Sequence, residues 1–512
     1  MPTARSKKEQ RSKILPALAL LLAVVSPAFA AAPALPAPFT PPLLPPKVDF
    51  PSSKIIAITD TGAVPDGKTL VTNAINKAID QCAAAGGGIV QFPKILHENS
   101  RGAHQPTEYL TGPIHLKSNI TLQIDEGVTL KFSSDRSLYP VVKTRYEAVD
   151  VMNFSPLIYA YQCENIRITG KGTIDGQGSD WWAWARTASA RAPRANAAPL
   201  PPLRGADSGQ GVGPNPDALR TMLDFTNDRA GRFPLETRIL GNTIPGFRPC
   251  LVEPYGCKNV LIEGVTLRQS PFWTIHPVYS TNVTVRNCTV IGDGPNTDGC
   301  DPDSCNTVLI ENTAFTTGDD CIAIKSGRDG DGIRRNAPCE NITIRNCTMK
   351  GGHGAITMGS ETSAGIRNVF AENCQVDGPD SAIRLKSTRG RGGGIENIYI
   401  RNITTTRTLK YAITIDMFYS KTAPAPKSET TPVFKNIRIE NFTCENAPQA
   451  IYVMGLPESP VENLTLKNIT IKGDKGAHLE QIRGLTRENV TVTPKMGEAW
   501  EIKDVTDALP SR

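Results

Sequence analysis

Short segments in which apolar and polar residues alternate recur along most of the chain. Each segment begins with asparagine and continues with an apolar, a polar and a second apolar residue. Successive segments start about 23 to 40 residues apart, except across one long interruption. Their first residues are Asn165, Asn259, Asn282, Asn306, Asn341, Asn368, Asn397, Asn436 and Asn463. Alternation predicts short strands with one buried face, and asparagine tolerates the left-handed and turn conformations that connect them. We therefore predict an all-β chain folded as a right-handed parallel β-helix, because parallel crossovers strongly prefer that hand.

A cap is predicted at the N-terminal end of these repeats. Apolar residues follow helical spacing between Val71 and Ala85, and Gly86 ends the pattern. The apolar positions are Ala74, Ile75, Ala78, Ile79 and Cys82. A short helix here would cover the open end of the stack, as solenoids require. We therefore assign residues 47–135 to a helical and strand cap with the first rungs.

The other segments differ in composition. Residues 136–495 carry the repeats and form the predicted β-helix domain, and residues 496–512 form a C-terminal tail. The interruption, residues 187–245, is rich in Ala, Pro, Arg and Gly and is predicted to be an inserted loop, partly ordered, beside the functional face. Residues 31–46, rich in Pro and Ala, predict an extended linker.

Residues 1–30 are typical of a secretory signal peptide. Five basic residues precede or border the apolar stretch Ile14–Val25, which is shorter than the ~20 residues that a membrane-spanning helix needs. Small residues at Ala28 and Ala30 predict cleavage after Ala30. We therefore expect a secreted protein, periplasmic or extracellular, without a membrane anchor.

Charge and cysteine content narrow the classes of partner. Loss of residues 1–30, which hold five basic side chains and one acidic one, would lower the net charge from +6 to about +2, so nucleic-acid binding gains no support. Twelve cysteines in an exported chain ordinarily indicate disulfides. Half of them lie in the repeats and are expected to point into the core: Cys163, Cys257, Cys288, Cys347, Cys374 and Cys444. We expect at most one or two disulfides, from among Cys250, Cys300, Cys305 and Cys339.

Four polar motifs recur at nearly the same phase of the repeat. They are Asn296-Thr297-Asp298, Gly318-Asp319-Asp320, Gly352-His353-Gly354 and Arg384-Leu385-Lys386. Rungs stacked in register would bring them to one face, although they are far apart in the sequence. Residues i and i+2 of a strand share a face. Asn296 and Asp298 are therefore expected to project together, as are Arg384 and Lys386. Gly318 permits a backbone break that would expose both of the following aspartates.

These residue types together predict acid-catalysed glycoside hydrolysis. Carboxyl groups held close together cannot all ionise freely, so one proton is retained near neutral pH. Glycosidic cleavage needs a protonated carboxyl for the leaving oxygen and a carboxylate that activates water. Arg384 and Lys386 would bind an anionic sugar, and His353, between two glycines, would orient or tune the acid. The predicted partner is therefore an acidic polysaccharide.

An acidic surface turn or a calcium site is the alternative for the aspartates. The neighbouring cations Arg384 and Lys386 would compete with a metal ion, so we expect neither a metal nor a cofactor. His276 is assigned to packing, and the remaining histidines form no cluster with metal-ligand spacing.

The four motifs, in this order, resemble the signatures of the polygalacturonases, glycoside hydrolase family 28, over roughly residues 50–490. The resemblance implies a right-handed β-helix and hydrolysis of α-1,4-D-galacturonosyl bonds of polygalacturonate or pectin with inversion. It implies a general acid at Asp319, and carboxylates at Asp298 and Asp320 that hold and activate water. The implied substrate-binding residues are Asn296, Lys325, Arg384, Lys386 and Tyr411. Gly318 and Lys325 replace the Gln and Asn common in fungal members, which affects substrate placement rather than the reaction.

Several alternatives stay open on sequence alone. The insertion at residues 187–245 could wall off one end of a groove, which slightly favours exo over endo action. Another pectin-active enzyme, either a rhamnogalacturonan hydrolase or a lyase, would use the same solenoid. A non-catalytic polysaccharide-binding solenoid is the alternative from another class. We expect a monomer, since solenoids of this kind commonly stand alone.

Overall fold

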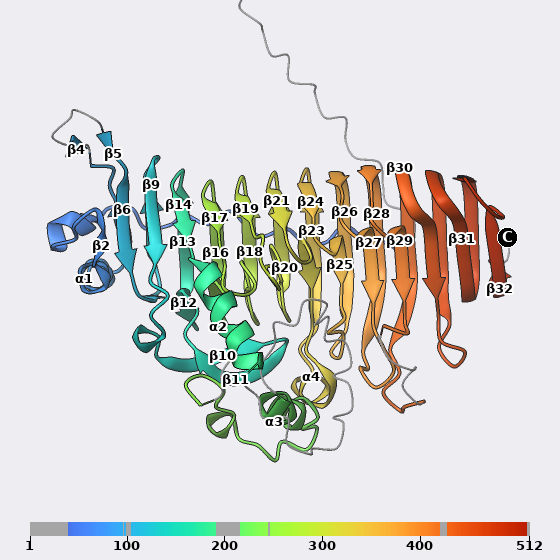
Figure 1. The fold of residues 1–512 in the computed structure, drawn as a ribbon, viewed down its shortest axis with the longest axis horizontal. Coiled ribbons are helices and arrows are strands. Elements are labelled where there is room, and N and C mark those ends of the chain that lie inside the picture. The colour runs from blue at the N-terminus through green and yellow to red at the C-terminus, as the bar shows by residue number, and fades with distance from the viewer. Residues whose placement is uncertain are drawn as a thin grey trace, which may run out of the picture. The chain divides into compact units, whose positions relative to one another are not determined.

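The described part of the chain is a stack of parallel strands. The computed structural model describes residues 39–95, 97–98, 104–190, 216–243, 246–419 and 427–508. They belong to one compact unit, a right-handed parallel β-helix as predicted, whose rungs are seen side by side in Figure 1. The predicted signal peptide and half of the predicted linker lie outside the described residues. Within those residues, no helix is long and apolar enough to cross a membrane.

Three ladders of parallel strands run along the stack. The first contains β1 (Ile55–Ala57), β3 (Gly88–Phe92), β8 (Ile120–Ile124), β13 (Glu164–Gly170), β16 (Lys258–Glu263), β18 (Thr281–Arg286), β20 (Asn306–Glu311), β23 (Cys339–Arg345), β26 (Ile366–Asp377), β28 (Gly394–Arg407), β30 (Val433–Met454) and β31 (Val461–Pro494). The second contains β2 (Asp66–Leu70), β6 (Thr107–Thr111), β9 (Val128–Phe132), β14 (Thr173–Asp175), β17 (Thr266–Arg268), β19 (Thr289–Ile291), β21 (Ala314–Thr317) and β24 (Thr348–Gly351).

The third ladder carries the residues of greatest functional interest. It contains β7 (Ile114–Leu116), β12 (Ile158–Tyr161), β15 (Val252–Tyr255), single pairings at Ile275 and Cys300, β22 (Ile322–Ile324), β25 (Gly354–Met358), β27 (Ser381–Lys386), β29 (Tyr411–Asp416), later parts of β30 and β31, and β32 (Trp500–Asp507). The segment predicted as a C-terminal tail therefore supplies the last strand of this ladder.

The repeated asparagines lie within the first four residues of the strands of the first ladder, near the predicted strand starts. Asn165, Asn259 and Asn282 have φ values of 55°, 60° and 58°, in the left-handed region that asparagine tolerates. The side-chain amide of Asn259 donates to the Oδ1 atom of Asn165 at 2.8 Å, and that of Asn282 donates to Asn259 at 2.9 Å. The amides thus bond from rung to rung rather than to their own backbone, which aligns successive rungs.

The predicted cap helix is present as α1 (Thr72–Ala84), one residue shorter at each end than predicted. Its buried residues are the five predicted ones, Ala74, Ile75, Ala78, Ile79 and Cys82. The helix packs against β1, β3 and β7. Burial of Ile75 and Ile79 stabilises this contact by about 1.5–3 kcal/mol each.

All twelve cysteines lie in described residues, and all are buried free thiols. The repeat cysteines point into the core as predicted, and the absence of disulfides among the described cysteines stays within the expected maximum of one or two. Cys300 and Cys305 are 0% exposed members of the core, and the thiol of Cys305 donates to the carbonyl oxygen of Pro277 at 3.1 Å. These thiols act as small apolar side chains, and some of them donate weakly to carbonyl oxygens of the neighbouring rung.

A group of elements that we call the covering layer lies beside the third ladder. It comprises the antiparallel hairpin of β10 (Val141–Tyr146) and β11 (Val149–Phe154) with α3 (Pro216–Thr226) and α4 (Asp329–Arg335), seen together with α2 (Gly178–Ala190) in Figure 1. The predicted insertion supplies α3 and the end of α2. Its Arg238 donates to Asp331 of α4 at 2.6 Å and to Asp228 at 2.9 Å. These buried ion pairs hold the described part of the insertion against α4.

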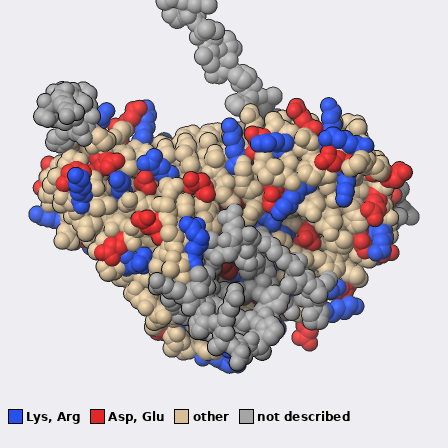
Figure 2. Space-filling model, in the orientation of Figure 1, with Lys and Arg blue, Asp and Glu red and all other residues tan. Residues whose placement is uncertain are grey.

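Short elements complete the described chain. They are the 3-10 helices η1 (Ile58–Thr61), η2 (Arg136–Leu138) and η3 (Leu235–Thr237), and the two-residue strands β4 (His97–Glu98) and β5 (His104–Gln105). Basic and acidic side chains are intermixed on the face drawn in Figure 2, which agrees with the modest net charge.

Candidate active site

An outer row of side chains crosses the strands of the third ladder. Each member follows a buried core residue such as Ile322 or Ile383, and alternation turns it away from the core. The outer row is His115, Tyr159, Glu253, His276, Asp301, Ala323, Thr357, Arg384, Thr414, Tyr452, His478 and Glu501. The predicted motifs therefore meet on this face, because their rungs stack in register.

The three predicted acids converge beside the middle of this row. Asp298 precedes the pairing at Cys300, and Asp319 and Asp320 lie in a bend between β21 and β22. One carboxylate oxygen from each lies within 4.8 Å of those of the other two. Gly318 is required for this bend, since a Cβ atom there would lie 2.4 Å from the carbonyl oxygen of Gly294. Gly318 does not, however, expose both aspartates: Asp319 is 7% exposed and Asp320 only 1%.

Asp320 is buried because two cations cover it. Arg384 NH1 donates to its Oδ1 at 3.0 Å, and Lys386 Nζ donates to its Oδ2 at 2.9 Å. Burial alone would raise the pKa of Asp320, but Lys386, Arg384 and two further cations lower it to about 2. Arg384 and Lys386 project together, as predicted, and they bind this carboxylate in the structure. Asp320 is therefore ionised at neutral pH.

Asp298 has the opposite electrostatic environment. It is 3% exposed, and its Oδ1 atom has no hydrogen-bond partner among the described residues. Burial, followed by the charges of Asp301 and Asp319, raises the pKa of Asp298 well above its ordinary value. The cluster thus holds an ionised carboxyl beside a protonated one, the separation of protonation states that acid–base catalysis uses.

His353 lies against the third acid. Its Nδ1 atom is 3.0 Å from Asp319 Oδ1. This hydrogen bond, which outweighs the opposing effect of burial, raises the pKa of His353. The imidazolium donates to Asp319 and fixes the orientation of its carboxyl.

A small hollow of about 50 Å³ opens onto the acids. Its lining residues are Glu147, Phe272, Trp273, Asn296, Asp298, Asp319, Asp320, Lys325, Ser360, Glu361, Lys386 and Tyr419. Predicted Asn296 is held there by Arg248, whose NH2 group donates to its Oδ1 atom at 2.8 Å. Predicted Tyr411 is not among the lining residues. It begins β29, one strand beyond β27.

Known proteins match both the sequence and the fold. Residues 247–492 match the family described as Glycosyl hydrolases family 28. A probable polygalacturonase of Vitis vinifera is 30% identical in an alignment of 428 positions that covers 81% of this chain and 74% of that protein. The crystal structure of a hyperthermoactive exopolygalacturonase from Thermotoga maritima has a TM-score of 0.74 and 34% identity, covering 89% of this chain and 94% of that one. The chain belongs to glycosyl hydrolase family 28.

This membership makes the protein a glycosidase and excludes the non-catalytic binding solenoid. Another relative, named exo-poly-alpha-D-galacturonosidase, from Dickeya chrysanthemi, is 28% identical in an alignment of 487 positions that covers 86% of this chain and 75% of that protein. The four motifs that meet at the acid cluster all lie within the matched residues 247–492.

Lys325, predicted to bind substrate, lies beneath the acids of the glycosidase. It is 4% exposed, and its Nζ atom lies 3.2 Å from Glu361 Oε2 and 4.5 Å from the ring centroid of Trp273. Burial would lower the pKa of Lys325, but Glu361 and the neighbouring aspartates raise it. Lys325 is therefore positively charged, and its charge stabilises both Glu361 and the ionised form of the acid cluster.

Several lining residues were not identified from the sequence. Glu361 and Tyr419 belong to no repeated motif, and Glu147 lies at the tip of the β10–β11 hairpin, outside the ladders. Asp301 stands in the first motif segment, and both of its carboxylate oxygens lack a partner among the described residues. Its place as the last residue of the segment Asn-Thr-Asp-Gly-Cys-Asp is the feature of the sequence from which Asp301 could have been identified as a site residue.

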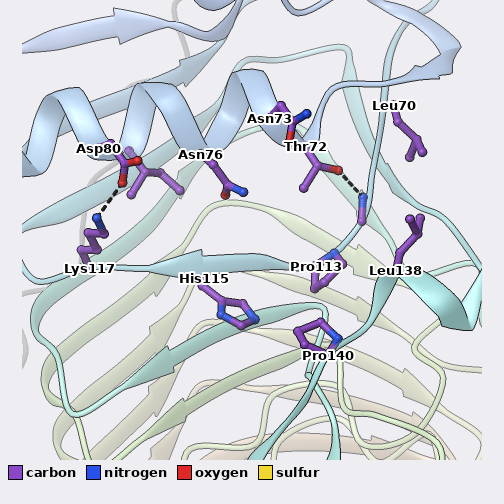
Figure 3. Close-up of a pocket in the computed structure, with 12 residues that line it drawn as sticks. Leu70, Thr72, Asn73, Asn76, Asp80, Pro113, His115, Lys117, Leu138 and Pro140 are labelled. Carbon is purple, nitrogen blue, oxygen red and sulfur yellow. Dashed lines mark hydrogen bonds and ion pairs between the residues drawn. The ribbon is translucent and has the colours of Figure 1, made fainter. Parts of the chain in front are cut away.

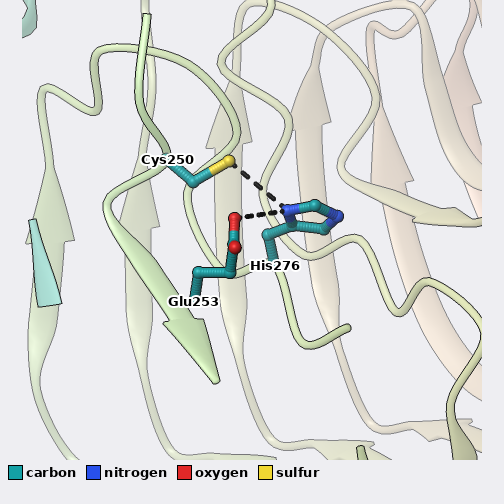
Figure 4. A group of neighbouring side chains, drawn as sticks. All are labelled: Cys250, Glu253 and His276. Atoms are coloured by element: carbon teal, nitrogen blue, oxygen red, sulfur yellow. Dashed lines mark hydrogen bonds and ion pairs between the residues drawn. The ribbon is translucent and has the colours of Figure 1, made fainter. Parts of the chain in front are cut away.

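His276 occupies a second buried cluster of the glycosidase, shown in Figure 4. Its Nδ1 atom lies 3.1 Å from Glu253 Oε2 and 3.4 Å from Cys250 Sγ, and its ring packs edge-on to Trp273. Thiol, imidazole and carboxylate could together ligate a transition metal. Where no metal is bound, burial raises the pKa of the Cys250 thiol to about 12. His276 Nε2 also lies 3.7 Å from Asp303 Oδ2, so the residue predicted to have a packing role stands in a buried polar cluster.

A larger cavity than the hollow at the acids lies away from them, between α1 and the start of the third ladder (Figure 3). It has a volume of about 600 Å³. Asp80 is the one carboxylate among its lining residues, and it pairs with Lys117 at 2.6 Å. The cavity therefore lacks the paired carboxyl groups that glycoside hydrolysis requires.

Proposed function

We propose that this glycosidase hydrolyses α-1,4-D-galacturonosyl bonds of polygalacturonate or pectin by a single displacement with inversion, acting from a chain end. The main support for this proposal is the position of Asp320, which is paired with Arg384 and Lys386 and lies beside Asp298 and Asp319. Two adjacent cations at the reacting centre suit a sugar that bears a carboxylate. The names of the Vitis and Thermotoga relatives support the same substrate.

The proposed proton transfers follow from the three environments. Burial raises the pKa of Asp298, so a proton is retained within 4.8 Å of Asp319. Asp298 passes this proton to Asp319, which delivers it to the leaving oxygen, since Asp319 is the most exposed of the three acids and His353 orients it. Ionised Asp320 accepts a proton from the attacking water, and Asp298 helps to hold that water. Water attack leaves the anomeric centre inverted.

The same cations couple substrate charge to catalysis. Arg384 and Lys386 suppress the basicity of Asp320, as its pKa of about 2 indicates. A substrate carboxylate that accepts hydrogen bonds from either cation draws positive charge away from Asp320 and restores its basicity. An uncharged sugar would leave Asp320 paired with both cations and weakly basic. The arrangement therefore favours acidic substrates in the chemical step as well as in binding.

The short separation of the acids makes stereochemistry worth measuring. Inverting glycosidases usually separate their two carboxyl groups by about 6.5–9.5 Å, and retaining ones by about 5–5.5 Å. Here oxygens from the three acids lie within 4.8 Å. Protonated Asp298 and ion-paired Asp320 are both poor nucleophiles, which favours water as the attacking group. Nuclear magnetic resonance of the first product anomer tests this: an initial α-anomer would exclude inversion of an α-linkage.

Exo action is supported by a difference between the two sides of the acids. On the N-terminal side of the acids, Tyr159, Glu253 and His276 of the outer row are at most 5% exposed, whereas on the C-terminal side Thr414 is 5% exposed but Tyr452 and His478 are only half-buried. The covering layer closes the N-terminal side, since Tyr159 donates to the carbonyl oxygen of Lys143 at 2.5 Å and Arg145 donates to Asp303 at 2.8 Å. A polymer can therefore extend from the site on the C-terminal side, while the other side accepts a chain end.

Product analysis tests both substrate and mode. Incubation with polygalacturonate should release monomer or dimer early without a rapid fall in viscosity, and an early viscosity collapse would refute exo action. Release of reducing sugar from rhamnogalacturonan alone would favour a rhamnogalacturonan hydrolase. Products with unsaturated, ultraviolet-absorbing ends, lost on addition of a chelator, would indicate a calcium-dependent lyase.

Secretion and a monomeric state belong to the same proposal. The basic, apolar and small-residue segments of residues 1–30 support export. N-terminal sequencing of the exported protein should begin at Ala31, and retention in the cytoplasm would contradict export. Sedimentation should give the mass of one chain.

A further inference from the structure

Glu147 enters the hollow beside the acids from the tip of the β10–β11 hairpin. It lines the hollow together with Asp298 and Asp320, and its side chain is 28% exposed. Its Oε2 atom accepts a hydrogen bond from NH1 of Arg328, whose side chain is only 2% exposed. Within the part of the chain that the structure describes, no group donates to its Oε1 atom. The carboxylate is therefore anchored through one oxygen, and the other is available in the hollow.

The turn that carries Glu147 has an unfavourable backbone for its sequence. Tyr146 pairs with Val149, so Glu147 and Ala148 form a two-residue hairpin turn. Their φ values are 44° and 62°, in the left-handed region that such turns require and that glycine and asparagine usually supply. Strain of this kind is usually retained where it serves a function. The turn thus keeps a carboxylate at a position where backbone geometry alone favours another residue.

The residues that precede the turn fix its position. The ring of Tyr146 stacks on Phe272 with centroids 4.7 Å apart and planes inclined by 16°, and it contacts Phe247 edge-on at 4.8 Å. Arg145 donates to Asp303 at 2.8 Å. All five residues are at most 3% exposed. The available carboxylate oxygen is therefore held in one place, which is the preorganisation that recognition of a single hydroxyl needs.

We propose that Glu147 recognises the non-reducing end of the polymer by accepting a hydrogen bond from the free O4 hydroxyl of the terminal galacturonate. This inference rests on the proposed function. In an α-1,4-linked chain only the non-reducing terminal unit has a free O4 hydroxyl, because every other O4 atom belongs to a glycosidic bond. The anomeric hydroxyl at the reducing end interconverts between two orientations, which a single fixed oxygen does not match. An ionised acceptor strengthens the hydrogen bond to the O4 hydroxyl.

Size and charge both exclude an interior segment of the polymer at this position. The hollow has a volume of about 50 Å³, less than that of two water molecules in the liquid at about 30 Å³ each. It admits the hydroxyl-bearing edge of one sugar but not a further unit. A further galacturonate would also bring its carboxylate against Glu147, and like charges repel each other. The same side chain therefore binds the chain end and rejects a continuing chain.

Trigalacturonate and its analogue with a 4,5-unsaturated terminal unit, which lacks the O4 hydroxyl, test the proposal. The parent enzyme should hydrolyse the saturated trimer with the higher kcat/KM. In Glu147→Ala, the ratio of kcat/KM for the saturated trimer to that for the unsaturated one should fall about ten- to hundredfold. The change in this ratio between parent and variant carries the test, because the unsaturated ring also differs in shape.

The matched control is Glu372→Ala. The carboxylate of Glu372 pairs with buried Arg401 at 2.7 Å between β26 and β28 of the first ladder, and it does not line the hollow. The control variant therefore loses an ion pair of the same kind. Its ratio should equal that of the parent enzyme.

The outcomes separate this inference from the proposed function. A parent enzyme that hydrolyses no galacturonate oligomer would overturn both. A parent that hydrolyses the saturated trimer, with an unchanged ratio in Glu147→Ala, would overturn recognition by Glu147 and leave the proposed function intact. A trimer chemically reduced at its reducing end provides a further arm. If Glu147→Ala changed the preference for the native over the reduced trimer instead, Glu147 would recognise the other end and the proposal would be wrong.

Circular dichroism establishes the folding of Glu147→Ala, in which Glu361 and Asp329 still stabilise the charge of Arg328. If this variant fails to fold, Glu147→Gln carries the same test. Its ratio should fall by a smaller factor, because the amide keeps a neutral hydrogen-bonding group in the hollow. An unchanged ratio in folded Glu147→Gln would then overturn the proposal.

Discussion

Asp319 Oδ1 and His353 Nδ1 lie 3.0 Å apart, on two adjacent rungs of the stack. The contact raises the pKa of His353. A raised pKa means that the pair stabilises the fold fully below the ordinary histidine value of about 6.5 and loses this contribution as pH rises through the raised value. The form with a protonated His353 is therefore the one in which Asp319 is oriented for catalysis.

The substitution His353→Gln should lower kcat about tenfold or more. It should also remove the fall in kcat at alkaline pH that follows deprotonation of the imidazolium. Glutamine keeps a donor but cannot titrate, so the pH profile rather than the rate identifies the role. His115→Gln is the control, since His115 bonds to Ser155 at 2.8 Å beside the other cavity. An unchanged alkaline limb in His353→Gln would show that another group sets it.

Removal of the proposed general acid should affect kcat far more than KM. In Asp319→Asn the carboxamide keeps the shape of the side chain but cannot deliver a proton, so kcat should fall about 10²- to 10⁴-fold. Steady-state kinetics on polygalacturonate measure this, with Asp80→Asn as a control at the distant cavity. A loss smaller than tenfold would move the acid role to Asp298.

Asp320 should make the folded protein sensitive to strong acid. Its pKa is lowered from 3.8 to about 2, so its ion pairs stabilise the fold above pH 4 and lose that contribution as pH falls through about 2. The shift corresponds to a contribution on the order of 2 kcal/mol. Asp320→Asn should lower Tm at pH 5 and flatten the fall in Tm between pH 4 and pH 2. A variant whose Tm curve runs parallel to that of the parent would contradict this.

Methyl esterification should slow hydrolysis, because an ester cannot draw Arg384 and Lys386 away from Asp320. Comparison of kcat on free and on fully esterified oligomers of equal length measures the effect. In Lys386→Met the preference for the free acid should shrink, since one of the two cations is gone. A preference that persists at full size in Lys386→Met would assign it to other contacts.

The recurring asparagines and the four motifs made the fold and the acid cluster predictable. Period-two alternation specifies which side of each strand is buried, and Asn259 and Asn282 mark where the strands begin. The motif phase then places Asp298 and Asp319 together, because stacking converts a constant phase into proximity. Local pattern and global fold thus carry the same information in a solenoid.

The partners of the charged groups could not be predicted in this way. Phase indicates that Arg384 and Lys386 project together, but not that both bind Asp320. That pairing depends on how side chains of neighbouring rungs meet, which the phase of the repeat does not specify. Glu147 reaches the hollow from a hairpin that breaks the repeat, so periodicity carries no signal for it. The number of disulfides likewise depends on side-chain contacts that the repeat does not specify.

Buried Lys325 provides the sharpest test of how the acids are tuned. Lys325→Met removes the positive charge that lowers the pKa values of Asp298 and Asp320, so both pKa values should rise. The acid limb of kcat/KM, which requires ionised Asp320, should then shift to higher pH. Glu361 loses the partner that lies 3.2 Å away but keeps Arg391 at 3.1 Å, so the loss of stability should be smaller than the about 3–5 kcal/mol of a buried pair that is broken completely.

The matched control for Lys325→Met is Lys117→Met, which breaks the exposed pair with Asp80 and should change stability by about 1 kcal/mol or less. The Lys325→Met variant should keep part of its stability, because Arg391 remains 3.1 Å from Glu361. An acid limb that does not move in Lys325→Met would mean that Arg384 and Lys386 alone keep Asp320 ionised.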